Sequence, residues 1–169
     1  MSPLSAAVLA AQQHAHQAMR SAAPVPFTVL SPGEAAELGA IVSQIIPSDD
    51  TPGAREAGVV YFIDHALATF DSDKRELYTK GLDATRRKGA ELFPSQRIAD
   101  LRPEQQIQLL QAIEKTGFFE QVRTHTIMGF FGNPSYGGNR NGVGWKLIGF
   151  EDRFQFEPPF GYYDKESNR

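Results

Sequence analysis

Four histidines and their acidic neighbours are the residues of this chain whose types could do chemistry. His65 directly follows Asp64 in an apolar stretch, and His125 lies between Thr124 and Thr126. A histidine oriented by a carboxylate can serve as a general acid or base. A stand-alone hydrolase or lyase that uses His65 or His125 with Asp64 is therefore one hypothesis. No nucleophile elbow accompanies the pair, and a structural histidine at each position is the competing interpretation.

Residues that could ligate a metal ion are sparse. His14 and His16 form an HxH pair near the N-terminus, without an HExxH or ExxH motif elsewhere. The chain has no cysteine, which excludes disulfides, thiolate zinc sites and iron–sulfur clusters ligated by this chain. The acidic pair Asp49-Asp50 stands before Thr51 and Pro52, which is typical of a turn. The sequence predicts no metal site and no cofactor in this chain.

A glycine-rich segment near the C-terminus raises the question of nucleotide binding. Gly137, Gly138, Gly142 and Gly144 do not follow the GxGxxG spacing, and no GxxxxGK[ST] motif occurs. No strand pattern precedes them, as a dinucleotide-binding fold would require. These glycines must serve another purpose.

The run 129–150, GFFGNPSYGGNRNGVGWKLIGF, combines seven glycines with five aromatic residues. Glycine permits positive φ and close backbone approach, and aromatic side chains supply large buried areas. Both in one segment predict a loop of fixed shape that packs against something. Arg140, between two asparagines, can fork onto carboxylates or carbonyls, either as a clasp within the loop or as a contact to another subunit.

Length, composition and charge bound the remaining possibilities. A chain of 169 residues suits one domain, which we place at residues 27–169 behind a tail of residues 1–26. The net charge of −3 gives no support for nucleic-acid binding, and no apolar run is long enough to span a bilayer. Two interpretations of the alanine-rich tail stay open: a flexible or docking tail, or the remnant of an export signal.

Hydrophobic periodicity predicts an all-α domain of roughly five helices, bundle-like, with an irregular C-terminal third. No sustained two-residue alternation occurs. Ser31-Pro32-Gly33-Glu34 is a capping box that opens the first helix, and Pro47 stops it. The further helices are expected over 59–70, from 71 or 72 past Thr85, from Pro103 to Gly117, and over 118–131. The last is expected to be more deeply buried, and it is apolar on most sides from Ile127 onward.

The end of the chain is unusually aromatic for a tail. Phe154, Phe156, Phe160, Tyr162 and Tyr163 surround a Pro158-Pro159 pair that excludes regular helix. Such a segment must pack onto its own domain or onto a partner, and we expect a partner for part of it.

At these segments the chain resembles the gluconate 2-dehydrogenase subunit 3 family. The resemblance rests on the IIP…TPGAREAGV stretch (45–59), on the run 129–150, and on the closing PPFGYYD (158–164). With the helical middle it covers nearly everything after residue 25.

The resemblance implies a small subunit that carries no cofactor and no catalytic residue of its own. Its large partner would be an FAD-containing oxidoreductase of the glucose–methanol–choline type that oxidises a sugar or glycoside hydroxyl. Electrons would pass to an acceptor other than oxygen, often a cytochrome c subunit. The location would be periplasmic, because such small subunits commonly carry a twin-arginine signal and help the folded partner to mature and cross the membrane. This chain departs from that pattern, since no Arg-Arg pair precedes an apolar stretch.

On this basis we expect the aromatic residues of the loop and the tail to contact the large subunit. They are Phe130, Phe131, Tyr136, Trp145, Phe160, Tyr162 and Tyr163, with Asn139 and Arg140 fixing the loop. A further alternative is an export chaperone that leaves the mature enzyme.

Overall fold

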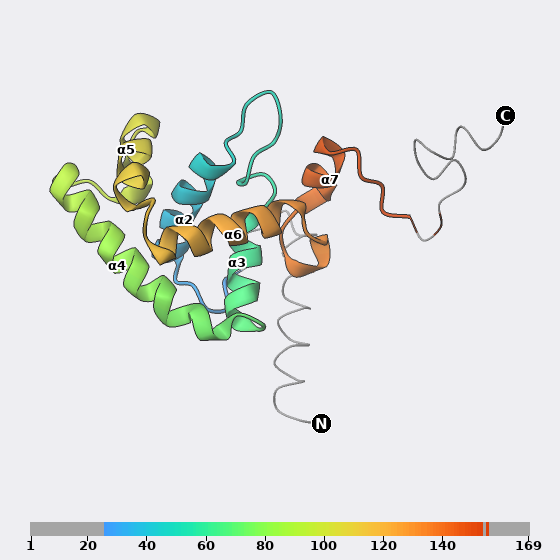
Figure 1. Cartoon of the computed structure of the whole chain (residues 1–169), viewed down its shortest axis with the longest axis horizontal. Coiled ribbons are helices and arrows are strands. Elements are labelled where there is room, and N and C mark those ends of the chain that lie inside the picture. The colour runs from blue at the N-terminus through green and yellow to red at the C-terminus, as the bar shows by residue number, and fades with distance from the viewer. Residues whose placement is uncertain (1–25, 154, 156–169) are drawn as a thin grey trace.

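The computed structural model describes residues 26–153 and 155, and all regular secondary structure in this part of the chain is helical (Figure 1). It holds six α-helices, α2 to α7, and four short 3-10 turns, η1 to η4, without a strand. The predicted all-α class is confirmed. The helix that the sequence analysis did not expect is α7 (Val143–Leu147), a short helix inside the irregular C-terminal third. The expected N-terminal tail and the aromatic end of the chain lie outside the described residues.

Helix α2 (Pro32–Ile45) begins where its capping box predicts. The Ser31 hydroxyl accepts the Glu34 backbone N–H, and the Glu34 carboxylate accepts the Ser31 backbone N–H. These two reciprocal bonds satisfy donors that the first helical turn leaves unpaired. Residues Leu38, Ile41 and Val42 then follow at helical spacing and are buried.

Helix α3 (Val59–Ala68) is buried on most sides, and its start depends on a glycine. Gly58 is the N-cap residue at φ +70°, a backbone conformation that side chains rarely adopt. The Asp64 carboxylate on this helix accepts the backbone N–H groups of Thr28, Val29 and Leu30 at 2.7–2.9 Å. The segment that leads into α2 is thereby tied to the middle of α3.

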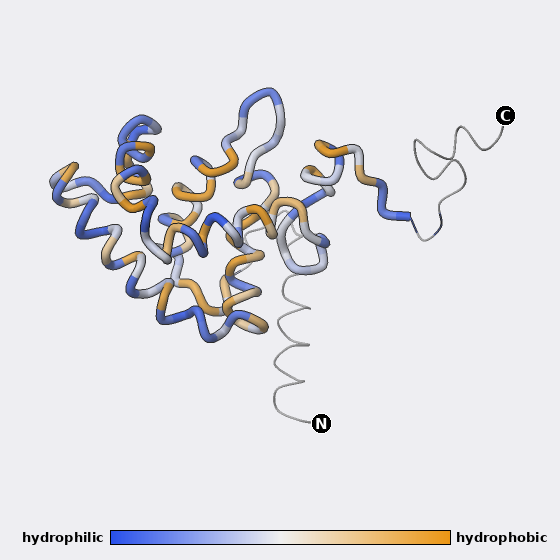
Figure 2. Tube along the Cα trace, viewed as in Figure 1, coloured by the Kyte–Doolittle hydropathy of each residue, from blue (hydrophilic) through white to orange (hydrophobic). Residues whose placement is uncertain are grey.

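Helix α4 (Arg75–Leu92) follows η1 (Ser72–Lys74), which agrees with the expected start near residue 72. It is the longest of the six helices and largely hydrophilic (Figure 2). Its buried residues recur at helical spacing on one side: Tyr78, Leu82, Thr85 and Gly89. Its Gly81 allows α6 to approach closely, because a Cβ at that position would overlap the ring of Phe118.

Helices α5 (Pro103–Ile113) and α6 (Gly117–Phe131) meet at a turn that corrects one expectation. Gly117 does not end α5 but is the first residue of α6. Thr116 is the N-cap, since its hydroxyl accepts the Phe119 backbone N–H. A threonine cap outweighs the usual preference of glycine for helix ends. The short turn η2 (Ile98–Asp100) joins α4 to α5.

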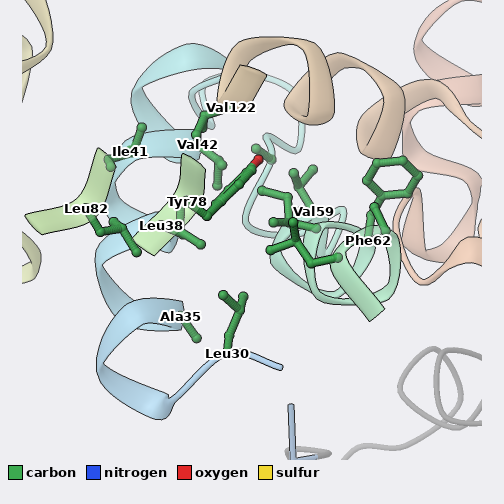
Figure 3. Packing of buried hydrophobic residues seen from close by; sticks show 14 of the residues in the cluster. Leu30, Ala35, Leu38, Ile41, Val42, Val59, Phe62, Tyr78, Leu82 and Val122 are labelled. Atoms are coloured by element: carbon green, nitrogen blue, oxygen red, sulfur yellow. The ribbon is translucent and has the colours of Figure 1, made fainter. Parts of the chain in front are cut away.

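Helix α6 crosses the molecule and packs on α2, α3 and α4, with α7 against its far end (Figure 1). The main core lies between these helices and includes Leu38, Val42, Phe62, Tyr78 and Val122 (Figure 3). A smaller cluster around Ile98 and Leu109 packs α5 and η2 against α2 and the end of α4. None of the described helices combines the length and the apolar character needed to cross a membrane.

Candidate functional site

The glycine-rich segment is shaped by its own chain, because it folds back on the last turns of α6. A Cβ on Gly138 would overlap the carbonyl oxygen of Gly129, and one on Gly144 would overlap the carbonyl oxygen of Phe130. Gly129 in turn lies against the ring of Phe62 on α3. The object against which the loop packs is therefore α6, and glycine is needed where two backbones touch.

Asn139 holds this loop at its centre. Its side chain is fully buried, its Nδ2 donates to the Gly132 carbonyl at 2.9 Å, and its Oδ1 accepts the Gly144 N–H at 2.8 Å. Its backbone N–H donates to the Gly129 carbonyl. The residue adopts φ +45°, which asparagine tolerates better than most side chains. Asn139 fixes the loop by contacts within the chain.

Arg140 clasps the loop to the start of α3. Its backbone N–H donates to the Ala57 carbonyl at 2.9 Å. Its guanidinium lies 5.4 Å from the centre of the Tyr61 ring, within the range of a cation–π contact. Tyr61 stacks on Phe27, with 4.8 Å between ring centres. Of the two interpretations of Arg140, these contacts favour the internal clasp.

The aromatic residues that the sequence analysis assigned to the interface have different surroundings. Phe130 is fully buried in the core and presents no surface to a partner. Phe131 and Trp145 are half-buried, and the Trp145 Nε1 donates to the Phe131 carbonyl at 2.7 Å. Tyr136, in η3 (Pro134–Tyr136), is 40% exposed. Phe160, Tyr162 and Tyr163 lie outside the described residues.

Tyr136 borders an open groove of about 650 Å³ between the end of α3 and the end of α6. We call it the α3–α6 groove and define it by Phe62, Phe70, Ile127, Met128, Phe131 and Tyr136. Phe70 is 49% exposed, and Ile127 and Met128 are each 42% exposed. The expectation of a more deeply buried helix is wrong at Ile127 and Met128. Exposed apolar side chains that gather at one groove make it a candidate interaction site.

A second group of exposed apolar side chains lies at the last residue of α7 and just after it. Leu147, Ile148 and Phe150 are all exposed, and the Phe150 ring contacts Trp145 with 5.0 Å between ring centres. The run 129–150 therefore buries its glycines and leaves several of its large apolar side chains at the surface.

Both histidines of the described residues are buried. His125 is fully buried; its Nδ1 lies 2.8 Å from the Tyr78 hydroxyl and its Nε2 lies 2.9 Å from the Asp71 carboxylate. Burial, and then the charge of Asp71, raise the pKa of the Tyr78 hydroxyl. The Tyr78 hydroxyl stays neutral there and can donate to the imidazole. This chain of bonds joins α4, α6 and the turn before η1.

Asp64 and His65 both make structural contacts. Both carboxylate oxygens of Asp64 accept backbone N–H groups from residues 28–30. The His65 ring is buried and packs against the rings of Phe70 and Tyr136. His14 and His16 lie outside the described residues, and within the described ones no three His, Cys, Asp or Glu side chains gather as a metal site would require.

A known protein family matches most of the chain. The family described as gluconate 2-dehydrogenase subunit 3 matches residues 32–152. The chain belongs to this family. No curated protein and no solved structure matches it. The family is named for one subunit of a dehydrogenase, so the chain is a subunit of a multi-subunit dehydrogenase complex and not its catalytic part.

The family match includes the α3–α6 groove, the loop and the exposed residues after α7. It ends before the PPFGYYD stretch at 158–164, on which part of the resemblance rested. Sequence reasoning missed Phe70, Ile127 and Met128 as surface residues. Their helical spacing predicts burial, and only the path of the neighbouring elements reveals which apolar side chains remain uncovered.

Proposed function

We propose that the chain is the small subunit that binds and stabilises the FAD-containing catalytic subunit of a sugar or glycoside dehydrogenase. The observation that carries this proposal is the match to a dehydrogenase subunit family over most of the chain. A flavoprotein must fold around its cofactor before it can work. A partner that binds only the folded form stabilises it by mass action.

The apolar surfaces support a binding role. Exposed large side chains at the α3–α6 groove and beyond α7 supply the kind of anchors that stable interfaces use. Asp64 gives the stand-alone hydrolase no support, because both of its carboxylate oxygens already accept backbone N–H groups from residues 28–30. In this proposal the flavin, the sugar site and the electron transfer to a cytochrome c or other acceptor belong to the partners.

Maturation and export complete the proposal. The small subunit would join the flavin-loaded catalytic subunit before the pair reaches the periplasm, and would remain in the active enzyme. The alternative is a chaperone that dissociates from the mature enzyme.

Co-purification tests the subunit role against the chaperone alternative. An affinity tag on this chain should recover a stoichiometric large subunit with flavin absorbance and sugar-dependent dye reduction, and the two should co-elute in gel filtration. Recovery of this chain without flavin or activity would refute the subunit role. Active enzyme that lacks the chain would support the chaperone instead.

Trp145→Ala and Tyr162→Ala should both lower recovery of the large subunit. Cell fractionation should recover the complex from the periplasm.

A further inference from the structure

The solvent-facing side of α6 changes character along the helix. After the first residue, Gly117, its exposed positions follow helical spacing, and the next three are polar: Glu120, Arg123 and Thr124. The next two on the same side are Ile127 and Met128, which border the α3–α6 groove. A surface helix ordinarily keeps polar residues on its outer side. The outer side of α6 is therefore built for water over its first turns and for an apolar contact over its last.

The opposite wall of the groove is already assembled in the free chain. The rings of Phe62 and Phe70 lie 6.2 Å apart, and Phe70 meets the Tyr136 ring edge-on at 6.1 Å. His65 supports both Phe70 and Tyr136 from beneath, at 6.0 and 5.7 Å between ring centres. Since aromatic rings packed in this way lose little further freedom on binding, the groove is organised before an occupant arrives.

The chemistry of the lining restricts what can bind. Among the described residues no charged side chain borders the groove, and the polar side chains that do are Asn133 and Tyr136. A charged occupant would lose its hydration without gaining an ion pair. Apolar side chains gain from burial there, by about 25 cal/mol for each Å² removed from water. The matching surface is uncharged and apolar.

We propose that the α3–α6 groove receives an uncharged, apolar segment of the dehydrogenase's catalytic subunit, and that Ile127, Met128 and Phe70 are its main contacts. This inference rests on the proposed function, which supplies the partner. An interface shared by the family must lie within the residues that the family shares, and the whole groove lies within 32–152. It extends the expected interface to three residues outside the set first assigned to it.

Ile127→Asp tests the groove, and Ile107→Asp is its matched control. Ile107 is an isoleucine of similar exposure (46% against 42%) on α5, away from the groove. Affinity for the purified catalytic subunit should fall at least about tenfold for Ile127→Asp, as expected for an anchor of an interface. It should stay within about twofold for Ile107→Asp. Both variants should keep the thermal unfolding midpoint of the wild type, because both side chains lie at the surface.

A photo-reactive side chain identifies the occupant. Met128→p-benzoylphenylalanine in the assembled complex should cross-link to an apolar stretch of the catalytic subunit, and the same probe at Lys80 on α4 should not. Equal binding by Ile127→Asp and wild type would overturn the groove as the docking site and leave the subunit role intact. A cross-link to a second copy of this chain would overturn the occupant. Failure of the wild-type chain to bind the catalytic subunit would overturn the proposed function itself.

Discussion

Asn139 combines a backbone demand with two side-chain hydrogen bonds at one position. Its positive φ and its bonds to Gly132 and Gly144 hold the loop against the end of α6. We expect Asn139→Ala to lower the free energy of unfolding by about 2–4 kcal/mol, because two buried polar groups lose their partner and alanine tolerates the left-handed region poorly. Chemical denaturation measures this difference.

Asn141 offers the matched control for that experiment. It also has a positive φ (59°) but is exposed, so Asn141→Ala should lose only the conformational part, about 1 kcal/mol. Equal losses for the two variants would show that the buried bonds of Asn139 add nothing.

Tyr78 gives the fold a dependence on alkaline pH. A tyrosine in the unfolded chain loses its proton with a pKa near 10, whereas burial raises the pKa of Tyr78 in the folded chain. The contribution of Tyr78 to the free energy of unfolding is therefore complete below about pH 10. It is lost as the pH rises further, because the unfolded state then releases a proton that the folded state keeps. Unfolding curves at rising pH should show this loss, and Tyr78→Phe should remove part of it.

At neutral pH the same substitution isolates the hydrogen bond. Tyr78→Phe leaves the buried His125 Nδ1 without the hydroxyl that lies 2.8 Å away, and we expect a cost of about 1–3 kcal/mol. A variant as stable as the wild type would mean that the Tyr78–His125 contact contributes nothing to the fold.

At the scale of elements, Asp64 joins the entrance of α2 to α3. Each of its carboxylate oxygens accepts at least one backbone N–H. Asparagine has nearly the same shape, but in either orientation its NH₂ group would face a backbone N–H donor. We therefore expect Asp64→Asn to destabilise the chain by about 2–4 kcal/mol, with hydrogen exchange of the 28–30 amides as the local readout. Unchanged exchange at these amides would contradict the role.

The distance between α4 and α6 depends on a single glycine. A Cβ at Gly81 would overlap the Phe118 ring, whereas one at Gly33 on α2 has no atom within 4 Å. Gly81→Ala should destabilise the chain by about 1–3 kcal/mol through overpacking. Gly33→Ala should be neutral or stabilising by up to about 1 kcal/mol, because alanine favours helix. The melting temperature should fall for Gly81→Ala, and it should stay level or rise for Gly33→Ala.

Local signals predicted the elements well where one residue decides a boundary. The Ser31 capping box placed the start of α2, and Pro103 placed the start of α5. Gly117 was misassigned because glycine suits both a helix end and a first turn, and the hydroxyl of Thr116 decides between them. Chain order could not predict the α3–α6 groove, since Phe70 and Ile127 come together only when α6 crosses α3.

At the scale of the molecule, substitutions of two aromatic residues six positions apart can distinguish effects on stability from effects on partner binding. Phe130 is buried in the core, and Tyr136 is exposed at the groove. Phe130→Ala should cost about 3–5 kcal/mol of stability. Tyr136→Ala should change stability by less than about 1 kcal/mol and lower affinity for the catalytic subunit. Paired unfolding and binding measurements check both, and a binding loss that follows stability in both variants would refute the separation.

The sequence predicted that the run 129–150 forms a loop of fixed shape, but not the surface against which this loop packs. Glycines and rings in one segment predict a fixed loop equally well against a partner or against the chain itself. The close approach of Gly138 and Gly144 to the backbone of α6 distinguishes these possibilities, and it requires coordinates. The expected partner contacts of Phe131, Tyr136 and Trp145 stay predictions.

Because the loop in the run 129–150 is held against α6 in the free chain, it need not change its conformation when a partner binds. Encounter should then be a rigid-body event, with an association rate constant in the ordinary range of about 10⁵–10⁷ M⁻¹s⁻¹. Stopped-flow mixing should give one phase whose rate grows linearly with concentration, without the plateau that a slow ordering step would impose.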